Sequence, residues 1–489
     1  MIGVTPKAFL GLVVPPKKLA CPNIVLAVID VTEGFSPGRY LPYESHASLH
    51  HRDSPGKVWM REGHPMKRPP IGGDSYKPSI NPARSPSMVA PLLYVGSAYA
   101  FLIAAALVLM KNGRLLAIGD YGSFAVVLVV HLFTLGFLSM TAMGVLTQWV
   151  PVVFDVAPQA TRHIVRNFLL YLIAIFTFAA GLTFHQSALL AAGGILLALA
   201  ISLWSIGVWQ QSAVSAKAEP TLLRGLRGSL WAFNLVWLLG LFMALSFLGG
   251  WPTRGILPVH IATALVGWMG LLVLTVQQKL NPMFSMSRGQ GIRFHLPIYT
   301  AATGLIVSWF SLFTSTILFR VGAGFWSLAA LISMVQSFQV VRQGKEKSLD
   351  PVFFGVAASW MMLAASAVLS LWMSPLAVIV AFWGLFILIF SYQTRILPFI
   401  AAIAITRRAP APGHPAFYLA KSLQAKHLPL FTAVIAVAGV TLAIIGRLTL
   451  RTQFEAASGV AVIVLVLMQL SAMAAAMFQA RRRPVPSSR

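Results

Sequence analysis

Long apolar runs separated by short polar or basic segments fill the chain from residue 88 onward. A bilayer-spanning α-helix needs about 20 apolar residues, and runs of that length recur here. The pattern predicts twelve spans, at 88–110, 121–151, 165–184, 187–211, 228–248, 256–280, 296–318, 321–341, 350–373, 375–400, 428–446 and 456–479. We therefore expect an all-α polytopic membrane protein with a twelve-helix membrane domain at 88–480, followed by a basic tail at 481–489.

The segment before the first span has a different pattern. Residues 1–87 hold 13 of the 30 prolines and no apolar run of spanning length. Proline and Gly-Gly pairs interrupt any regular element. We expect this segment to be disordered, or to lie outside the translated protein if translation begins at Met88. The segment contains four histidines, which we interpret as unstructured polar residues rather than as a metal-binding tract: His46, His50, His51 and His64.

Composition excludes a soluble protein. The chain is 57% hydrophobic with a mean hydropathy of +0.77, and 10% of its residues are charged, against about 25% in soluble domains. A net charge of +25 in a soluble protein would indicate nucleic acid, but here the basic residues lie between apolar runs. The expected partner is therefore the lipid bilayer, with no nucleic acid. The single cysteine, Cys21, allows no intrachain disulfide.

The distribution of Lys and Arg predicts the orientation. If the N-terminus is cytoplasmic, the cytoplasmic loops and the C-terminal tail carry 20 of the basic residues after residue 88. The loops on the opposite side of the membrane carry the other six. Cytoplasmic loops carry the excess of positive charge. We expect both termini to be cytoplasmic, in what is most simply a prokaryotic cytoplasmic membrane.

Acidic residues are scarce in the membrane part. Each of the six after residue 88 is expected in a loop or at the end of a span: Asp120, Asp155, Glu219, Glu346, Asp350 and Glu455. Proton-driven carriers and pumps usually bury a carboxylate on the ion path. This pattern argues against both.

Three even-numbered spans share a register of glycine and proline. The spacing from Gly to Pro is 15, 15 and 14 residues, and a polar residue lies three positions before each proline. The sets are Gly136, Gln148 and Pro151 in the second span, Gly267, Lys279 and Pro282 in the sixth, and Gly384, Arg395 and Pro398 in the tenth. Glycine lets helices approach closely, and we expect each proline to end its helix. The repeat predicts three pseudo-symmetric four-helix units.

Two histidines lie inside predicted spans. Ionisable residues in spans are rare and indicate a functional site. His131 and His260 are therefore candidate cofactor ligands, with an interhelical hydrogen bond as the alternative role. His185, in a turn at the same membrane face, is a candidate second metal ligand beside His260, or a solvated loop residue. The remaining histidines of the membrane part are expected near its cytoplasmic side: His163, His295, His414 and His427.

Several features together resemble the catalytic subunit of the heme–copper oxidase superfamily, which includes the nitric oxide reductases. They are the twelve spans, the threefold repeat, the segment His131-Leu-Phe-Thr-Leu-Gly-Phe137, and His260 before Gly267-Trp268. The resemblance covers 88–480. It implies that His131 occupies the position of a low-spin heme ligand and His260 that of the active-site metal ligand. Heme b and copper or non-heme iron are the implied cofactors. Respiratory-chain subunits or a cytochrome electron donor are the implied partners, in respiratory or nitric oxide-related electron transfer.

The sequence also departs from that family. The tenth span has no histidine, and His295 lies at the cytoplasmic end of the seventh, where the family often has an outer histidine pair. This pattern indicates a divergent member, an oxidoreductase if it is an enzyme. Two other classes stay open: a membrane transporter or channel, and a cofactor-free structural partner of a respiratory complex.

Overall fold

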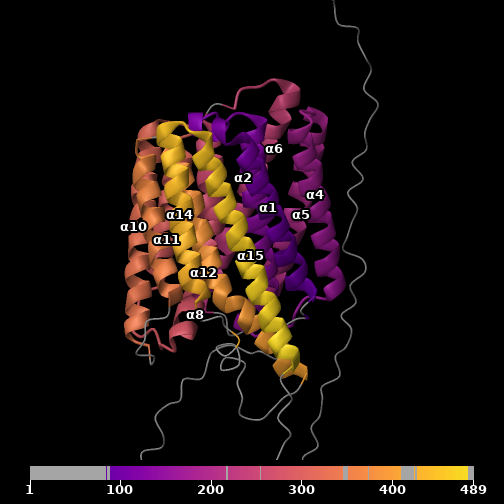
Figure 1. Cartoon of the computed structure of the whole chain (residues 1–489), viewed down its shortest axis with the longest axis vertical. Coiled ribbons are helices and arrows are strands. Elements are labelled where there is room, and N and C mark those ends of the chain that lie inside the picture. The colour runs from indigo at the N-terminus through magenta and orange to yellow at the C-terminus, as the bar shows by residue number, and fades with distance from the viewer. Residues whose placement is uncertain are drawn as a thin grey trace, which may run out of the picture. The chain divides into compact units, whose positions relative to one another are not determined.

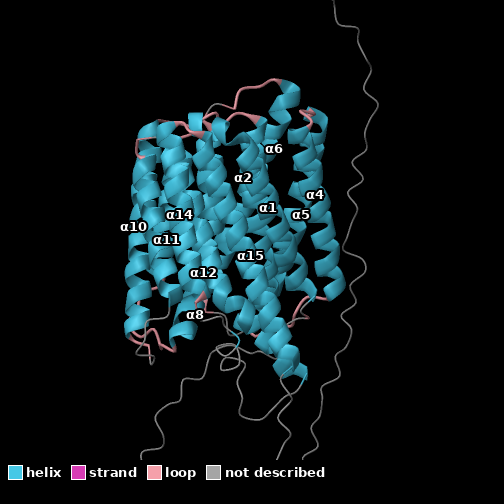
Figure 2. Ribbon diagram, in the orientation of Figure 1, coloured by secondary structure: helices cyan, strands magenta, loops and turns pink. Residues whose placement is uncertain are grey.

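The computed structural model describes Arg84, Ser87 and residues 89–215, 219–253, 255–344, 351–372, 374–408, 423 and 427–482. Over these residues the chain forms long helices that run up and down side by side, with no strand (Figures 1 and 2). This confirms the all-α polytopic fold. The predictions for residues 1–87, including the start at Met88, fall almost wholly outside the described residues, as does the tail beyond Arg482.

The helices form three runs of four, and consecutive spans contact each other within each run. The first run joins the two ends of the chain, because α15 contacts α1. It consists of α14 (Leu428–Thr449), α15 (Thr452–Arg482), α1 (Val89–Ile118) and the second span, which is α2 (Phe124–His131), η2 (Leu132–Ser139) and α3 (Met140–Phe154).

The second and third runs follow in chain order. The second consists of α4 (Thr161–Thr183), α5 (Ser187–Ala213), α6 (Pro220–Gly249) and the sixth span, which is α7 (Ile256–Ala262), η3 (Thr263–Gly270) and α8 (Leu271–Ser285). The third consists of α9 (His295–Phe310), α10 (Thr316–Arg342), α11 (Pro351–Ser370) and the tenth span, α12 (Pro375–Arg408). Each run therefore ends in a span that carries the Gly–Pro repeat, as three four-helix units require.

Eleven helices in the described part of the chain are long and apolar enough to cross a membrane. The seventh span, α9, is the exception, with 16 residues. The sequence predicts it at 296–318, but it ends at Phe310, and α10 begins at Thr316 rather than at 321. The break falls in a Ser/Thr-rich stretch, where Ser311 Oγ donates 2.6 Å to the carbonyl of Ser308 and competes with the helix.

The second and sixth spans repeat each other in backbone detail. Each contains an eight-residue π-helical segment, η2 or η3, that begins four residues before its glycine, Gly136 or Gly267. Each helix also ends in a left-handed residue four positions after its proline, Asp155 at φ 53° and Met286 at φ 53°. Hydrophobicity alone cannot produce this shared register. The tenth span is α-helical throughout and shares only the sequence motif.

The expectation that each proline ends its helix is wrong. Pro151 and Pro282 lie inside the last turn, and α12 continues ten residues beyond Pro398. A proline removes one backbone donor, but a helix can keep its course where packing on neighbouring helices holds it. In the second and sixth spans, the left-handed cap residue ends the helix instead.

The three repeat-bearing spans meet in the middle of the bundle. Phe133 of the second span packs edge-on against Phe382 of α12, with ring centroids 5.2 Å apart. Trp268 of the sixth span hydrogen-bonds Ser139 of the second. A small cavity of about 60 Å³ near the proline ends is lined by all three spans.

Glycine allows this close approach. A Cβ atom on Gly136 would lie 2.6 Å from the Cβ of Phe101 in α1, and one on Gly267 would lie 2.8 Å from the Cβ of Ala232 in α6. Both contacts are too short for any side chain, which confirms the packing role expected of these glycines.

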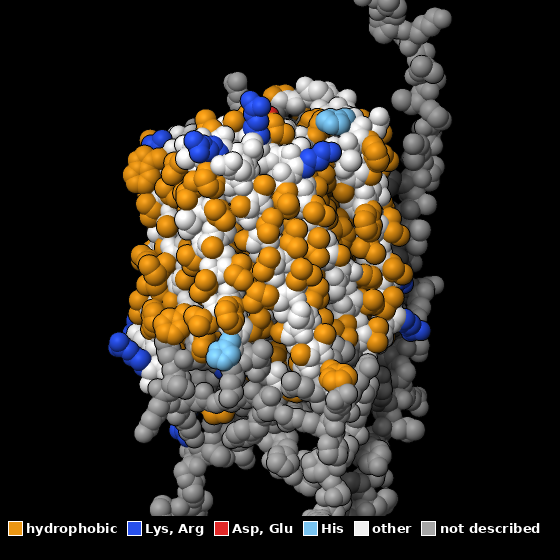
Figure 3. Space-filling view, viewed as in Figure 1, with side chains coloured by type: hydrophobic (Ala, Val, Ile, Leu, Met, Phe, Trp, Pro, Cys, Tyr) orange, Lys and Arg blue, Asp and Glu red, His pale blue; other side chains and the backbone are white. Residues whose placement is uncertain are grey.

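The sides of the bundle expose apolar residues, and Lys and Arg gather near its two ends (Figure 3). Exposed Phe176, Phe242, Phe310 and Trp231 belong to this apolar surface. Water would not tolerate so large an apolar area, whereas lipid does. The chain is therefore an integral membrane protein in contact with the bilayer.

Glu455 lies at the end of a span, as the sequence predicts, but its burial was not predicted. Glu455 belongs to the first turn of α15, and its side chain is fully buried. The predicted span begins at 456 because a charged residue scores against a span. The tertiary structure instead packs α1 and α14 around this turn.

Candidate functional site

Both intramembrane histidines lie just before a π-helical segment. His131 is the last residue of α2, and His260 lies two residues before the end of α7. A π-helical turn widens the helix and turns its side chains relative to a regular α-helix, and such turns are frequent at functional sites. The two segments therefore set the positions of the two imidazoles with respect to the rest of each span.

His131 and His260 line the same cavity. It has a volume of about 300 Å³ and lies between the second span, the sixth span, α4, α5 and α6. Most of its lining is apolar. The polar side chains besides the two histidines are Tyr121, Thr134, Ser139, Trp237, Ser246 and Thr253. A mainly apolar cavity with a few convergent polar groups is the usual form of a cofactor or small-ligand site.

A two-residue offset between the spans brings the two imidazoles into one cavity. His131 lies five residues before Gly136, and His260 lies seven before Gly267. Two residues rotate a position by about 200° around an α-helix. The residues at the matching positions confirm this: Val129, which matches His260, and Ala262, which matches His131, line two other cavities.

The hydrogen bond of His131 determines its tautomer. Nδ1 lies 2.7 Å from the carbonyl oxygen of Val127, one turn earlier in α2. A carbonyl only accepts, so Nδ1 carries the proton and donates it, which leaves the lone pair on Nε2. This arrangement is usual for a metal-ligating histidine, whose other nitrogen is held by a backbone carbonyl. The ring also packs on Phe178 of α4, with centroids 5.1 Å apart.

His260 has a buried nitrogen that forms no hydrogen bond. No group in the described part of the chain hydrogen-bonds its Nδ1. The ring lies beside Gly240 of α6, where a Cβ atom would come within 3.2 Å of Cε1. A buried polar atom without a partner is costly. It therefore points to a ligand, a water molecule or an ion that completes the site.

The two rings lie near each other and nearly parallel. Their centroids are 6.4 Å apart, and their planes are inclined by 27°. They come from separate units of the bundle, so the fold and not a local motif brings them together. Neutral imidazole binds heme iron, copper and zinc, and costs less to bury than a charge.

His185 does not join this pair. It occupies the exposed turn between α4 and α5, in a left-handed conformation at φ 55°. Its ring packs edge-on against Phe124, with centroids 4.8 Å apart. Phe124 lines the cavity, whereas His185 is absent from the lining. A role for His185 as a second metal ligand stays a prediction.

Elsewhere in the described residues, histidines lie apart from the cavity, and no three His, Cys, Asp or Glu side chains gather as a metal site. His163 lies in the first turn of α4, and His427 directly precedes α14. His295 is the first residue of α9 and packs near Tyr299. His414 lies outside the described residues. The nitrogen donors of the cavity are thus two imidazoles, and its lining also includes the Tyr121 side chain and the thioethers of Met243 and Met269.

Sequence reasoning found the two histidines but missed the residues that position them. Trp268, which donates 2.9 Å to Ser139, stacks on Phe233 of α6 with centroids 4.0 Å apart, and both aromatic rings line the cavity. Gly240 is also missed. The one sign of these roles in the sequence is that Phe137 and Trp268 each directly follow a repeat glycine.

No known protein family model matches this sequence, and a search of curated proteins finds no match either.

Proposed function

We propose that this integral membrane protein binds one redox cofactor in the cavity of His131 and His260, and that it is a divergent relative of the heme–copper oxidase catalytic subunits. The observation that carries the proposal is the pair of imidazoles, 6.4 Å apart, from two separate spans in one apolar cavity. The cofactor is a b-type heme, or a single copper or iron ion. Its role is electron transfer in respiratory or nitric oxide-related chemistry.

The donor set favours heme over a bare ion. A bound metal ion normally takes three or four protein ligands, and the cavity offers two imidazoles. Heme needs only axial ligands from the protein, because the macrocycle supplies the remaining nitrogens. The apolar lining suits a macrocycle, and the volume of about 300 Å³ lies at the lower end of ligand pockets, which span about 300–1,000 Å³.

The residues of the cavity have separate tasks in this proposal. His131 presents Nε2 as the ligand nitrogen, because Val127 holds its Nδ1–H. His260 presents its unpartnered Nδ1. The apolar lining excludes water and packs against the apolar porphyrin ring. When bound, heme supplies one-electron chemistry.

The test is the absorption spectrum of the protein after expression with ample heme, iron and copper. We expect a Soret band and an α band on reduction, or copper or iron in metal analysis. His131→Ala should abolish the signal, and His260→Ala should weaken or shift it. His295→Ala is the matched control, because this histidine lies outside the cavity, and it should leave the spectrum unchanged.

A wild-type protein with neither a Soret band nor bound metal would refute the proposal. The transporter or channel, or the structural partner of a respiratory complex, would then be the better account. Equal loss of signal in all three variants would indicate unfolding rather than ligation, so each variant must first show a monodisperse profile in detergent.

A further inference from the structure

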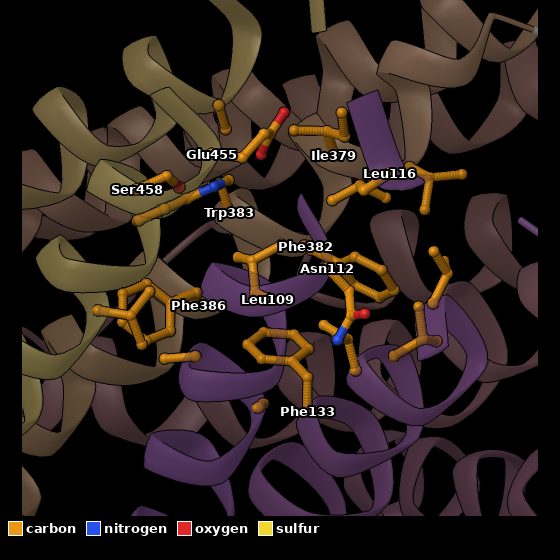
Figure 4. A pocket seen from close by; sticks show the side chains of 18 of the residues that line it. Leu109, Asn112, Leu116, Phe133, Ile379, Phe382, Trp383, Phe386, Glu455 and Ser458 are labelled. Carbon is orange, nitrogen blue, oxygen red and sulfur yellow. The ribbon is translucent and has the colours of Figure 1, made fainter. Parts of the chain in front are cut away.

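A second polar site lies in another part of the bundle, between α1, α2, α12, α14 and α15. A cavity of about 100 Å³ opens there, and the buried residues Glu455 and Ser458 line it from α15 (Figure 4). Asn112 of α1 and the aromatic side chains of Phe133, Phe382, Trp383 and Phe386 also line the cavity (Figure 4). No residue lines both this cavity and the histidine cavity, although Tyr121 of the histidine cavity interacts electrostatically with Glu455.

Glu455 is buried without a hydrogen bond. Its side chain is fully inaccessible, and no group in the described residues hydrogen-bonds either carboxyl oxygen or the hydroxyl of Ser458. Gly113 of α1 and Gly446 of α14 lie beside the Glu455 side chain: a Cβ atom on Gly113 would be 2.6 Å from its Cβ, and one on Gly446 would be 2.9 Å from its Oε1. Burying a carboxylate in this way is costly unless a cation or a proton neutralises it.

The charged and titratable groups that face Glu455 are few. Arg447 of α14 acts on it electrostatically, and Tyr121, from the turn between α1 and α2, interacts with both Arg447 and Glu455. The side chains that α1, α2 and α12 contribute to the cavity carry no titratable group. The positive charge of Arg447 opposes a second cation at this site. A metal ion would also need more oxygen ligands than the two carboxyl oxygens and the hydroxyl of Ser458.

We propose that Glu455 is a proton-binding site, at which a hydrated proton from the cavity protonates a carboxyl oxygen and leaves a water molecule behind. The reverse step returns the proton to water. A volume of about 100 Å³ has room for several water molecules, because one needs roughly 10–15 Å³ measured in this way.

Access to the site is short. Glu455 is the fourth residue of α15, and the residues just before it, Arg451, Thr452 and Gln453, are exposed. One helical turn therefore separates the carboxyl group from the loop between α14 and α15. Proton uptake and release on this loop face would suit a proton-coupled membrane protein, and the inference stands whether or not the histidine cavity holds a cofactor.

The test is modification of the protein in proteoliposomes by dicyclohexylcarbodiimide, which reacts with protonated carboxyl groups in apolar surroundings. Mass spectrometry of the digested protein locates the adduct. We expect an adduct on Glu455 that increases as the pH is lowered from alkaline to mildly acidic, and that added Na⁺ does not reduce. Glu219 is the internal control. It lies outside the spans, half-exposed and 3.4 Å from Lys279 Nζ, and should stay unmodified.

Two results would overturn the proposal. If Glu455 stays unmodified at every pH while the protein remains intact, its carboxylate is a permanently charged partner of Arg447. If Na⁺ at constant pH protects Glu455, the site binds a metal cation instead of a proton. Glu455→Gln should remove the adduct, but the result does not depend on this variant, because the wild-type digest identifies the modified residue.

Discussion

The indole N–H of Trp268 donates a hydrogen bond of 2.9 Å to the hydroxyl of Ser139. Both side chains are buried, and each belongs to a π-helical segment, η3 in the sixth span and η2 in the second. The bond joins the two spans that carry His131 and His260. It therefore fixes the separation of the helices on which the candidate site depends.

Replacing Trp268 tests the contribution of this hydrogen bond. Trp268→Phe removes the donor and leaves a gap beside Phe233. We expect a loss of about 1–3 kcal/mol of stability from the unpaired hydroxyl and the lost packing, measured as a lower midpoint of thermal unfolding in detergent. Trp231→Phe is the control, because Trp231 is 63% exposed on the lipid-facing surface. An equal loss in the control would show that the hydrogen bond has no special role.

Gly240 is expected to control the position of His260. In Gly240→Ala, the new methyl group would lie 3.2 Å from Cε1 of His260 and push the ring from its place. If the cavity binds a cofactor, its affinity should fall by about tenfold or more, as for changes in groups that position a ligand. Titration of the cofactor-free protein with heme or metal measures this.

Gly324→Ala provides the comparison for that experiment. Gly324 lies in α10, and a Cβ atom there meets nothing within 4 Å. Its affinity should match the wild type. A wild-type affinity in Gly240→Ala would mean that His260 does not hold the cofactor.

The repeat glycine of the second span should tolerate no side chain. Gly136→Ala places a methyl group 2.6 Å from the Cβ of Phe101, and such overpacking costs about 1–3 kcal/mol. Gly96→Ala in α1 meets nothing within 4 Å and should be neutral, or stabilising by up to about 1 kcal/mol through helix propensity. Thermal unfolding of the two variants in the same detergent measures this difference in stability. The interpretation of the repeat fails if Gly136→Ala is as stable as Gly96→Ala.

The predicted orientation can be tested with single cysteines in a Cys21→Ser background. Gln290, between α8 and α9, and Gln186, between α4 and α5, are both exposed at opposite ends of the bundle. Ser287, in the same loop as Gln290, is 1% exposed and unsuitable. We expect a membrane-impermeant maleimide to label a cysteine at Gln186 in intact cells, and one at Gln290 only after permeabilisation. The reverse pattern would contradict cytoplasmic termini.

Much of the fold follows from the sequence because a transmembrane helix is a local object. Each span must satisfy its own backbone hydrogen bonds in lipid, so an apolar run of sufficient length predicts it. The apolar pattern gives the wrong helix end at two places. It extends the seventh span past Phe310. It also leaves Glu455 out of α15, because a charged residue counts against a span whatever surrounds it in the fold.

The candidate site is only partly predictable for the same reason. The rarity of histidine in apolar runs singles out His131 and His260, and their positions relative to Gly136 and Gly267 can be counted in the sequence. With a two-residue offset, the two rings can point into the same cavity or into two different cavities. Which of these occurs depends on how the spans are arranged around each other. No local pattern contains that arrangement.

The sequence by itself determined a polytopic all-α membrane protein, the Gly–Pro register of three spans and the two intramembrane histidines. Each of these follows from hydrophobicity, residue type or spacing along one helix. Only the tertiary structure decided that His131 and His260 lie 6.4 Å apart in one cavity and that His185 lies outside its lining. It also decided that α1 and α14 enclose Glu455. These are contacts between helices far apart in sequence, and side-chain packing across the bundle, not helix propensity, selects them.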